Sequence, residues 1–431
     1  MQLGVSSCNG IREIIFEGTD VPISVERPFS DYAINVSTLH INRPLEGDLF
    51  YKSQPYYDYS SINTIYIGKF VEWLDDNLFY QCRKYIENII VEYSERPLYV
   101  GTGGYFFDYS RLDYYWKDFF YGMPLKNVSI SRDIIMKYAS SKSPGWDCAF
   151  STNDLIENVS IGYIHNAEVP KSSNDDRYYG MGGIYENRAP AISFLFPRSQ
   201  VKSLKLLDNY IYDVNISQFP VSLETITVDD DNPKYSILDG ALYNKNYTKF
   251  IGYPASFLEF KDYNLSEIVD TLESCSFGVC TDERIVLPQS IKYIGDKVFT
   301  NCSQLSCLYL RGEIPPKLST SAFAEEQYAL VTLYVPVGSK TKYEMADVWK
   351  KFWDIQEFDA TGVENITTNH TAFKITEDGI LLLNAEGKIV TIHAVNGTVV
   401  SNINNYNGEK IVLNKGIYIV RVGNKTIKVK L

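Results

Sequence analysis

The chain has 431 residues, with 53 acidic against 41 basic side chains and a net charge of −12. This length permits a sizeable core in more than one domain, and the acidic balance, without a Lys/Arg block, disfavours binding to nucleic acid or anionic lipid. No apolar run reaches the roughly 18 residues of a membrane span, and the N-terminus lacks the apolar segment of a signal peptide, so the protein is either cytosolic or has lost a targeting segment.

The N-terminal residues 1–34 contain no repeat, only an apolar patch at 11–16. We expect them to cap the open end of the repeat array that follows. Within them, Val5-Ser6-Ser7-Cys8 resembles the end of a bacterial lipoprotein signal, in which the cysteine becomes the lipidated first residue. That resemblance implies a lipid anchor on Cys8, and an ordinary N-terminal tail is the alternative.

From residue 35 the chain carries a series of triplets in which two apolar residues flank a variable one. They are Leu39–Ile41, Ile65–Ile67, Ile89–Val91, Val128–Ile130, Val159–Ile161, Leu204–Leu206, Ile226–Val228, Leu258–Phe260, Ile285–Leu287, Leu308–Leu310 and Leu333–Val335. In a strand the flanking side chains share one face and the middle one points to the other. The outward row is then Tyr66, Ser129, Ser160, Lys205, Thr227, Glu259, Tyr309 and Tyr334.

The spacing between triplets is irregular, which indicates insertions, and the aromatic residues concentrate there. Such insertions project as loops on one face of a repeat protein, often the binding face. Together with Tyr66, Tyr309 and Tyr334 of the row, we select the insertion residues Tyr114, Tyr115, Trp116, Tyr178 and Tyr179 as candidate binding residues.

The most regular stretch is Ile285–Leu305, and the next triplet begins 23 residues after its start (308 − 285). Its strand ends at a proline, and four apolar residues then follow at three- and four-residue spacing, as on one helical stripe. They are Val298, Phe299, Cys302 and Leu305. Such a unit can bury its apolar side only by stacking on copies of itself.

The pattern I-x-L-P-x-S-I-x-x-I-G-x-x-x-F-x-x-C-x-x-L in this stretch resembles the BspA-type leucine-rich repeat of surface proteins from host-associated anaerobic bacteria. The family usually has Ala before the Phe, where this chain has Val298. Cys82 and Cys302 occupy a repeat position at which the resemblance implies a small buried hydrophobe. The segment from Leu333 to Trp353 is similar to the family's closing unit, a last strand, a turn and an aromatic-rich helix over the open end.

Two further segments have patterns of their own. Asp229–Tyr243 resembles a family element with a polar turn followed by an Asp-Gly hairpin, and its three successive carboxylates lack the spacing of a calcium loop. After a polar linker at 359–371, short strands separated by Gly and Asn turns predict a small β-sandwich. Val390–Val400 and Leu413–Val422 resemble the C-terminal sorting domain of the Por (type IX) secretion system, which implies export and surface attachment.

The sequence contains no pattern that singles out catalytic chemistry. The four histidines are scattered, the seven cysteines form no CxxC pair, and neither a nucleophile elbow nor a phosphate-binding loop is present. We therefore predict no enzyme, no catalytic residue, no metal and no cofactor, although the plentiful carboxylates leave a glycosidase pair open.

The predicted fold class is an α/β solenoid of irregular leucine-rich repeats, short strands plus short helical or 3-10 turns, followed by a small all-β sandwich. The predicted domains are an N-terminal cap (1–34), the repeats (35–358, most regular at 220–358), a linker (359–371) and the sandwich (372–431). The resemblances imply a cell-surface or secreted protein that mediates adhesion by binding a host or bacterial surface protein. The alternatives are glycan binding through the aromatic insertions and a purely structural spacer.

Overall fold

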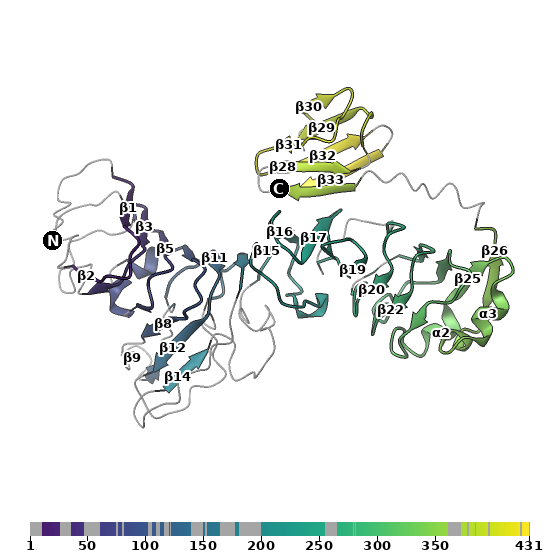
Figure 1. The fold of residues 1–431 in the computed structure, drawn as a ribbon, viewed down its shortest axis with the longest axis horizontal. Coiled ribbons are helices and arrows are strands. Elements are labelled where there is room, and N and C mark those ends of the chain that lie inside the picture. The colour runs from purple at the N-terminus through teal and green to yellow at the C-terminus, as the bar shows by residue number, and fades with distance from the viewer. Residues whose placement is uncertain are drawn as a thin grey trace. The chain divides into compact units, whose positions relative to one another are not determined.

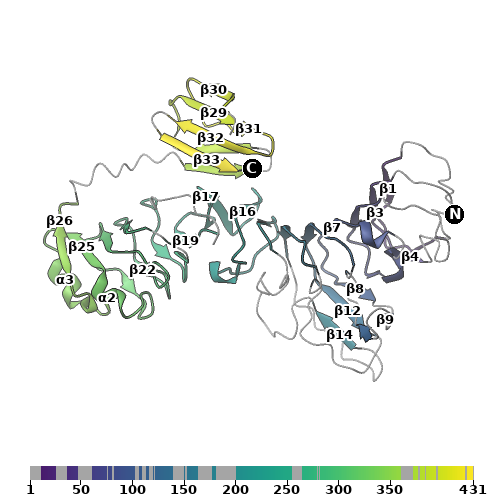
Figure 2. The same cartoon turned by 180° about the vertical axis from the view of Figure 1, so that it is seen from behind.

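The structure is a computed structural model of residues 1–431, in which the chain divides into two compact units, 1–213 (unit 1) and 214–431 (unit 2) (Figures 1 and 2). Each unit is described by itself. The described residues are 11–25, 36–46, 61–74, 76–79, 82–101, 106–108, 113–115, 120, 122–138, 150, 153–163, 177–180, 200–254, 265–278, 280, 282–360, 372–376, 379–383, 385–394, 397–422 and 425–430.

In unit 1 the apolar triplets form one parallel sheet whose strands follow each other in chain order (Figure 1). The strands are β1 (Glu13–Phe16), β3 (Thr38–Ile41), β5 (Thr64–Ile67), β7 (Asn88–Val91), β11 (Asn127–Ile130), β13 (Asn158–Ile161) and β15 (Ser203–Leu206). Each pairing is in register, so that Leu39 lies beside Ile65 and Ile65 beside Ile89. Strand β1 extends this sheet into the segment expected to be only a cap.

The remaining strands of unit 1 build the other walls of its coils, where a coil is one turn of the solenoid. A second sheet has the order β14 (Arg177–Gly180), β12 (Ile134–Tyr138), β8 (Leu98–Gly101) and β6 (Trp73–Leu74). The shorter pieces are β2 (Ile23–Ser24) beside β4 (Leu45–Glu46), the hairpin β9 (Phe106–Asp108) with β10 (Asp113–Tyr115), and the 3-10 turns η1 (Asp76–Phe79) and η2 (Arg83–Tyr85).

Unit 2 repeats this plan with two sheets. The triplets form the parallel sheet β21 (Arg284–Leu287), β23 (Cys307–Leu310), β25 (Thr332–Pro336) and β26 (Ile355–Phe358). The other sheet has the order β17 (Tyr235–Leu238), β18 (Ala241–Asn244), β19 (Lys249–Gly252), β20 (Thr271–Leu272), β22 (Tyr293–Ile294) and β24 (Lys317–Leu318). Strand β16 (Thr225–Val228) and the 3-10 turn η3 (Ile216–Gln218) precede them.

The sequence located the strands well. Every predicted triplet among the described residues lies in a strand with both flanking side chains buried, while Leu258–Phe260 falls outside those residues. The Asp-Gly hairpin is confirmed between β17 and β18, where Asp239 and Gly240 take φ of 53° and 78° as a primed turn requires. The carboxylates before it form a turn, in which Asn232 Oδ1 accepts the backbone N–H of Tyr235 at 2.9 Å.

The segment between the strands of a coil is a chain of turns, and the helical stripe expected at Val298–Leu305 was wrong. Cys302 N–H donates to Phe299 O at 2.9 Å and Leu305 N–H donates to Cys302 O at 3.2 Å, which are three-residue steps. Phe299 N–H instead donates to Ala322 O of the next coil at 2.9 Å. Because this donor bonds the neighbouring coil, it is not available to an α-helical ladder.

Close contact between coils also explains why residue 295 is glycine. A Cβ at this position would lie 2.8 Å from the backbone N of Ser274 in the preceding coil. The backbones approach so closely there that no side chain fits, and this requires glycine independently of its φ.

The closing segment of unit 2 contains α2 (Gln327–Leu330), α3 (Lys340–Met345) and the 3-10 turn η4 (Trp349–Lys351). Trp349 is buried and donates from Nε1 to Pro316 O at 2.7 Å, so it belongs to the core of the cap. Trp353 is 84 % exposed. The triplet sheet does not end at Leu333–Val335, because β26 pairs with β25 in parallel and adds one more strand.

The C-terminal residues form two antiparallel sheets. One contains β27 (Ala372–Thr376), β28 (Gly379–Leu383) and β31 (Ile411–Val412), and the other contains β30 (Val399–Ile403), β29 (Val390–Ala394), β32 (Ile417–Val422) and β33 (Lys425–Lys430). Both sheets contribute to one buried cluster, with Leu382 and Ile411 from the first and Ile392, Val420 and Val429 from the second. The sequence anticipated all of these strands except β27.

Replacing Phe299 tests whether stacking between coils stabilises unit 2. Its fully buried ring lies 5.4 Å from the Phe277 ring and 4.7 Å from the Phe323 ring, which belong to the two adjacent coils. Phe299→Ala leaves a cavity shared by three coils, so we expect a loss of about 3–5 kcal/mol in the free energy of unfolding. Urea-dependent hydrogen exchange with mass spectrometry measures this in peptides spanning residues 284–310.

The control for this substitution is Tyr293→Ala, since Tyr293 lies on β22 of the same unit and is 36 % exposed. It should shift the free energy of unfolding by less than about 1 kcal/mol. Equal effects of the two substitutions would show that the Phe299 ring is not a stacking centre.

Candidate binding surface

The outward face of each triplet sheet follows from the alternation of side chains along its strands. In the strands from β3 to β15 of unit 1, the second and fourth residues are buried and the first and third face outward. In-register pairing turns these positions into rows. The first-residue row is Glu13, Thr38, Thr64, Asn88, Asn127, Asn158 and Ser203, and the third-residue row is Ile15, His40, Tyr66, Ile90, Ser129, Ser160 and Lys205.

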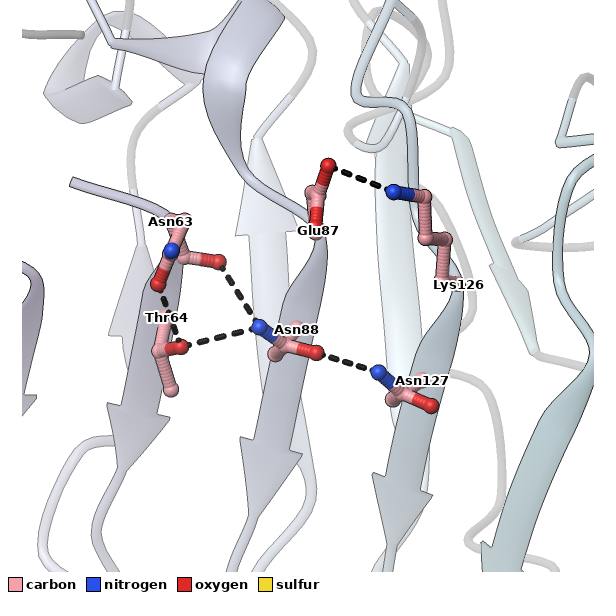
Figure 3. A network of polar contacts seen from close by, with 6 residues as sticks. All are labelled: Asn63, Thr64, Glu87, Asn88, Lys126 and Asn127. Carbon is pink, nitrogen blue, oxygen red and sulfur yellow. Dashed lines mark hydrogen bonds and ion pairs between the residues drawn. The ribbon is translucent and has the colours of Figure 1, made fainter. Parts of the chain in front are cut away.

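A chain of side-chain hydrogen bonds runs along the first-residue row, and we call it the amide ladder: Thr64, Asn88, Asn127 and Asn158, together with Asn63, which precedes Thr64. Figure 3 shows the ladder from Asn63 to Asn127. Asn88 Nδ2 donates to Thr64 Oγ1 at 2.9 Å, Asn127 Nδ2 to Asn88 Oδ1 at 2.5 Å, and Asn158 Nδ2 to Asn127 Oδ1 at 2.7 Å. Parallel strands lie about 4.8 Å apart, a spacing at which identical amides can bond head to tail. The ladder therefore fixes the rotamers of side chains that are otherwise open to solvent.

Ion pairs connect the residues just before these strands. Lys126 Nζ lies 2.7 Å from Glu87 Oε1 (Figure 3), and Lys202 Nζ lies 2.7 Å from Glu157 Oε1. All four side chains are about 40–50 % exposed, and solvent screening limits such pairs to less than about 1 kcal/mol each. The pairs leave this part of the face polar but electrically balanced.

The third-residue row is more apolar near the N-terminal end of the described residues. The His40 and Tyr66 rings stack with centroids 4.1 Å apart and planes inclined by 7°, and His40 Nε2 lies 2.5 Å from Glu13 Oε1. Ile15, which is 54 % exposed, precedes them in the row. Tyr66 is thus held in a preorganised aromatic pair with His40, and His40 in turn bonds the Glu13 carboxylate.

The corresponding face of unit 2 carries an aromatic group that we call the tyrosine stack: Arg284, Tyr309, Tyr334 and Phe358. The two tyrosine rings are stacked, with centroids 4.3 Å apart and planes inclined by 4°. The Arg284 guanidinium carbon lies 4.2 Å from the Tyr309 ring centroid, and the Phe358 ring meets Tyr309 edge-on at 5.2 Å. Partial burial, opposed by the Arg284 charge, raises the pKa of the Tyr309 hydroxyl, which keeps it a neutral donor.

For the other predicted binding residues, the structure gives only the strand to which each described residue belongs. Tyr114 and Tyr115 lie in strand β10 of the β9–β10 hairpin, and Tyr178 and Tyr179 lie in β14, which pairs with β12. These segments are strands where the sequence suggested loops. Trp116 and Cys8 fall outside the described residues.

Sequence reasoning missed the amide ladder and the ion pairs, although a signal was present. Asn127–Ile130 and Asn158–Ile161 are the same tetrapeptide, Asn-Val-Ser-Ile, and Asn88 opens the preceding strand. The residues before these asparagines alternate as Glu87, Lys126 and Glu157. The apolar-x-apolar pattern does not include the residue before each triplet, so it could not indicate the repeated asparagines.

Large pKa shifts occur inside the coils, not on these faces. Burial raises the pKa of the Cys82 thiol to about 12 and lowers the pKa of the Arg132 guanidinium to about 10. Arg132 donates from Nη2 to Gly68 O at 3.2 Å and from Nη1 to Lys69 O at 3.3 Å, so it links the corners of two coils. Within the described ranges, no three His, Cys, Asp or Glu side chains are grouped to hold a metal ion.

With this geometry in hand, the repeat can be assigned by comparison with known proteins. Residues 255–343 match the family model of the BspA type leucine rich repeat region, in six copies. This segment is therefore similar to the BspA-type leucine-rich repeat. It contains strands β20 to β25 and the stacked Phe277, Phe299 and Phe323, so the resemblance found in Ile285–Leu305 is confirmed for the repeat. The sequence matches no curated protein.

Three solved structures are similar to this chain. A leucine-rich repeat protein from Eubacterium ventriosum ATCC 27560 is 14 % identical over 70 % of this chain and 66 % of its own, just under two thirds, with a TM-score of 0.28. The pneumococcal vaccine antigen PcpA is 14 % identical over 83 % and 92 %, with a TM-score of 0.29. A leucine rich cell surface protein from Faecalibacterium prausnitzii A2-165 is 13 % identical over 77 % and 85 %, with a TM-score of 0.30.

None of the helices in the described part of the chain has the length and apolarity to cross a membrane.

A charge placed in the amide ladder should make stability depend on pH. Asn127→Asp removes the donor to Asn88 Oδ1 and sets two acceptor oxygens against each other, which favours the protonated acid in the folded state. The folded-state pKa of Asp at this position is then raised above its unfolded value of about 3.9. The variant should match the wild type below that pH and lose about 1 kcal/mol as pH rises through the raised pKa.

Thermal unfolding at pH 3 and pH 7 measures this difference. The control is Asn407→Asp, because Asn407 Oδ1 accepts the backbone N–H of Glu409, at 3.3 Å, and a carboxylate can keep that bond. A destabilisation of Asn127→Asp that is the same at both pH values would contradict the ladder.

Proposed function

We propose that this chain is an extracytoplasmic binding protein, exposed on a bacterial surface or secreted, and that it recognises a host or bacterial surface protein. The outward faces of the triplet sheets are the proposed contact surfaces. The observation that carries the proposal is the tyrosine stack, in which Tyr309 and Tyr334 are held parallel by each other and flanked by Arg284.

This arrangement suits protein recognition for an entropic reason. Tyrosine and arginine are the side chains that most often dominate binding energy at protein interfaces. A ring already fixed by its neighbours loses little rotamer freedom when a partner covers it, so less of the contact energy is spent on ordering. The stack lies on β23 and β25, two strands of a rigid sheet.

The amide ladder supports the same function in unit 1. Asn127 uses one N–H and one lone pair within the ladder, and its second N–H and remaining lone pair can bond the backbone or side chains of a partner. A row of such groups at the spacing of the strands presents regularly placed donors and acceptors. The balanced ion pairs beside it impose no strong charge preference on that partner.

The proposal extends to export and attachment. The two antiparallel sheets after residue 372 share the cluster of Leu382, Ile411, Ile392, Val420 and Val429, which supports a small β-sandwich. We propose that this sandwich directs export and surface attachment, as in the Por sorting domain that its strands resemble. A lipid on Cys8 is the second proposed means of attachment.

Binding of the purified chain to a panel of extracellular-matrix proteins and to a glycan array tests the proposal. With Tyr309→Ala and Tyr334→Ala combined, we expect protein binding to weaken at least about tenfold, since the anchors of an interface each contribute 1 kcal/mol or more. The matched control is Tyr293→Ala, which removes an exposed tyrosine from the other sheet of unit 2. Binding by the double variant within twofold of the wild type would contradict the assignment to the tyrosine stack.

A second variant separates protein from glycan recognition. It combines Tyr114→Ala, Tyr115→Ala and Trp116→Ala in the aromatic insertion. One outcome would be the loss of glycan binding in this variant and its retention in the tyrosine-stack variant. That outcome would contradict the proposed protein recognition and would support glycan recognition through the insertions.

A further inference from the structure

Two cysteines of the BspA-type region occupy equivalent places in consecutive coils. Cys280 follows Phe277 by three residues, and Cys302 follows Phe299 by three residues. The Phe277 and Phe299 rings are packed 5.4 Å apart, which fixes the alignment of the two coils. The cysteines are therefore neighbours through the stacking of the solenoid, although 22 positions (302 − 280) separate them in sequence.

The backbone on both sides of the cysteines keeps this alignment. Before them, Cys275 and Lys297 share the left-handed conformation, with φ of 61° and 52°, at the same place in each coil. Asn301, adjacent to Cys302, donates from Nδ2 to Gly278 O at 3.0 Å and so connects the two turns directly. The alignment thus rests on contacts other than those of the thiols.

Both thiols lie inside the core. Each cysteine is 1 % exposed, both belong to the same buried cluster, and Cys302 Sγ donates to Phe277 O, in the turn that leads to Cys280, at 3.7 Å. Cys280 Sγ donates to Asp282 Oδ2 at 3.8 Å. Equivalent backbone positions in parallel neighbours lie about 4.8 Å apart, within the roughly 4.4–6.8 Å that separates the Cα atoms of disulfides. The geometry points to a modification site: we propose that Cys280 and Cys302 form a disulfide between coils when the chain folds in an oxidising compartment.

The reaction is thiol–disulfide exchange with a small disulfide such as oxidised glutathione. The thiolate of one cysteine attacks the glutathione disulfide and releases one glutathione thiolate, and the other cysteine thiolate then attacks the mixed disulfide and releases the second. The protein pair loses two electrons and two protons, glutathione disulfide gains the electrons, and the protons end on the two glutathione thiols.

Burial determines when this can happen. In the folded chain the neighbouring Cys280 thiol, followed by burial, raises the pKa of the Cys302 thiol, so the reactive thiolate is scarce. The bond therefore forms while the coils are still closing and the thiols are reachable. Once formed, it connects two coils covalently and restricts the unfolded chain, which raises the unfolding temperature of the oxidised form.

The test is to refold the full chain from denaturant, once in a mixture of reduced and oxidised glutathione and once in excess reductant. Peptide mapping by mass spectrometry without reduction should find Cys280 and Cys302 in one linked peptide, lighter by two hydrogens, only in the first sample. The oxidised protein should unfold several degrees above the reduced one. Cys302→Ala should abolish the link, whereas Cys275→Ala and Cys307→Ala, at partly exposed positions, should keep it.

The peptide map of the wild-type chain decides the question even where Cys302→Ala fails to fold. Refolded protein in which both cysteines remain free and are alkylated after denaturation would overturn the proposal. A link from either cysteine to Cys275 or Cys307 would overturn it as well, because the alignment of the coils would then not select the pair.

Discussion

In-register stacking of coils is the constraint on which the rest of the structure depends. A single coil is a short strand and a chain of turns, and it has no second layer on which to bury its apolar side. Parallel hydrogen bonding places the same position of each coil above the last, so Leu39, Ile65 and Ile89 form one buried column. The stacked rings of Phe277, Phe299 and Phe323 form another.

The same register acts on polar residues. Amides that repeat at the first strand position bond head to tail, and tyrosines that repeat at the third position stack face to face. These ladders contribute less to the free energy of unfolding than the buried columns do. Screened ion pairs and exposed amides contribute little to it, whereas buried rings contribute several kcal/mol each. Stability therefore resides inside the coils, which leaves the outward rows free to vary.

Stacking also creates a need for buried hydrogen-bond donors, and both units meet it in the same way. Asn153 Nδ2 donates to Phe120 O at 3.2 Å and to Met123 O at 3.0 Å in unit 1. Gln327 Nε2 donates to Phe299 O at 2.9 Å and to Cys302 O at 3.2 Å in unit 2. In each case one buried amide bonds two turn carbonyls of the preceding coil, and these bonds satisfy an amide nitrogen that would otherwise be costly to bury.

The sequence by itself determined the strands of the triplets, the face each of their side chains takes and the stacking of repeats, because alternation at period two and a repeat near 23 residues are local properties of the chain. Only the tertiary structure decided that Val298–Leu305 forms turns, since Phe299 N–H bonds Ala322 of another coil. It also decided which outward residues meet. Asn88 and Asn127, or Arg284 and Tyr309, are distant in sequence and become neighbours through the register of the strands, which no single coil encodes.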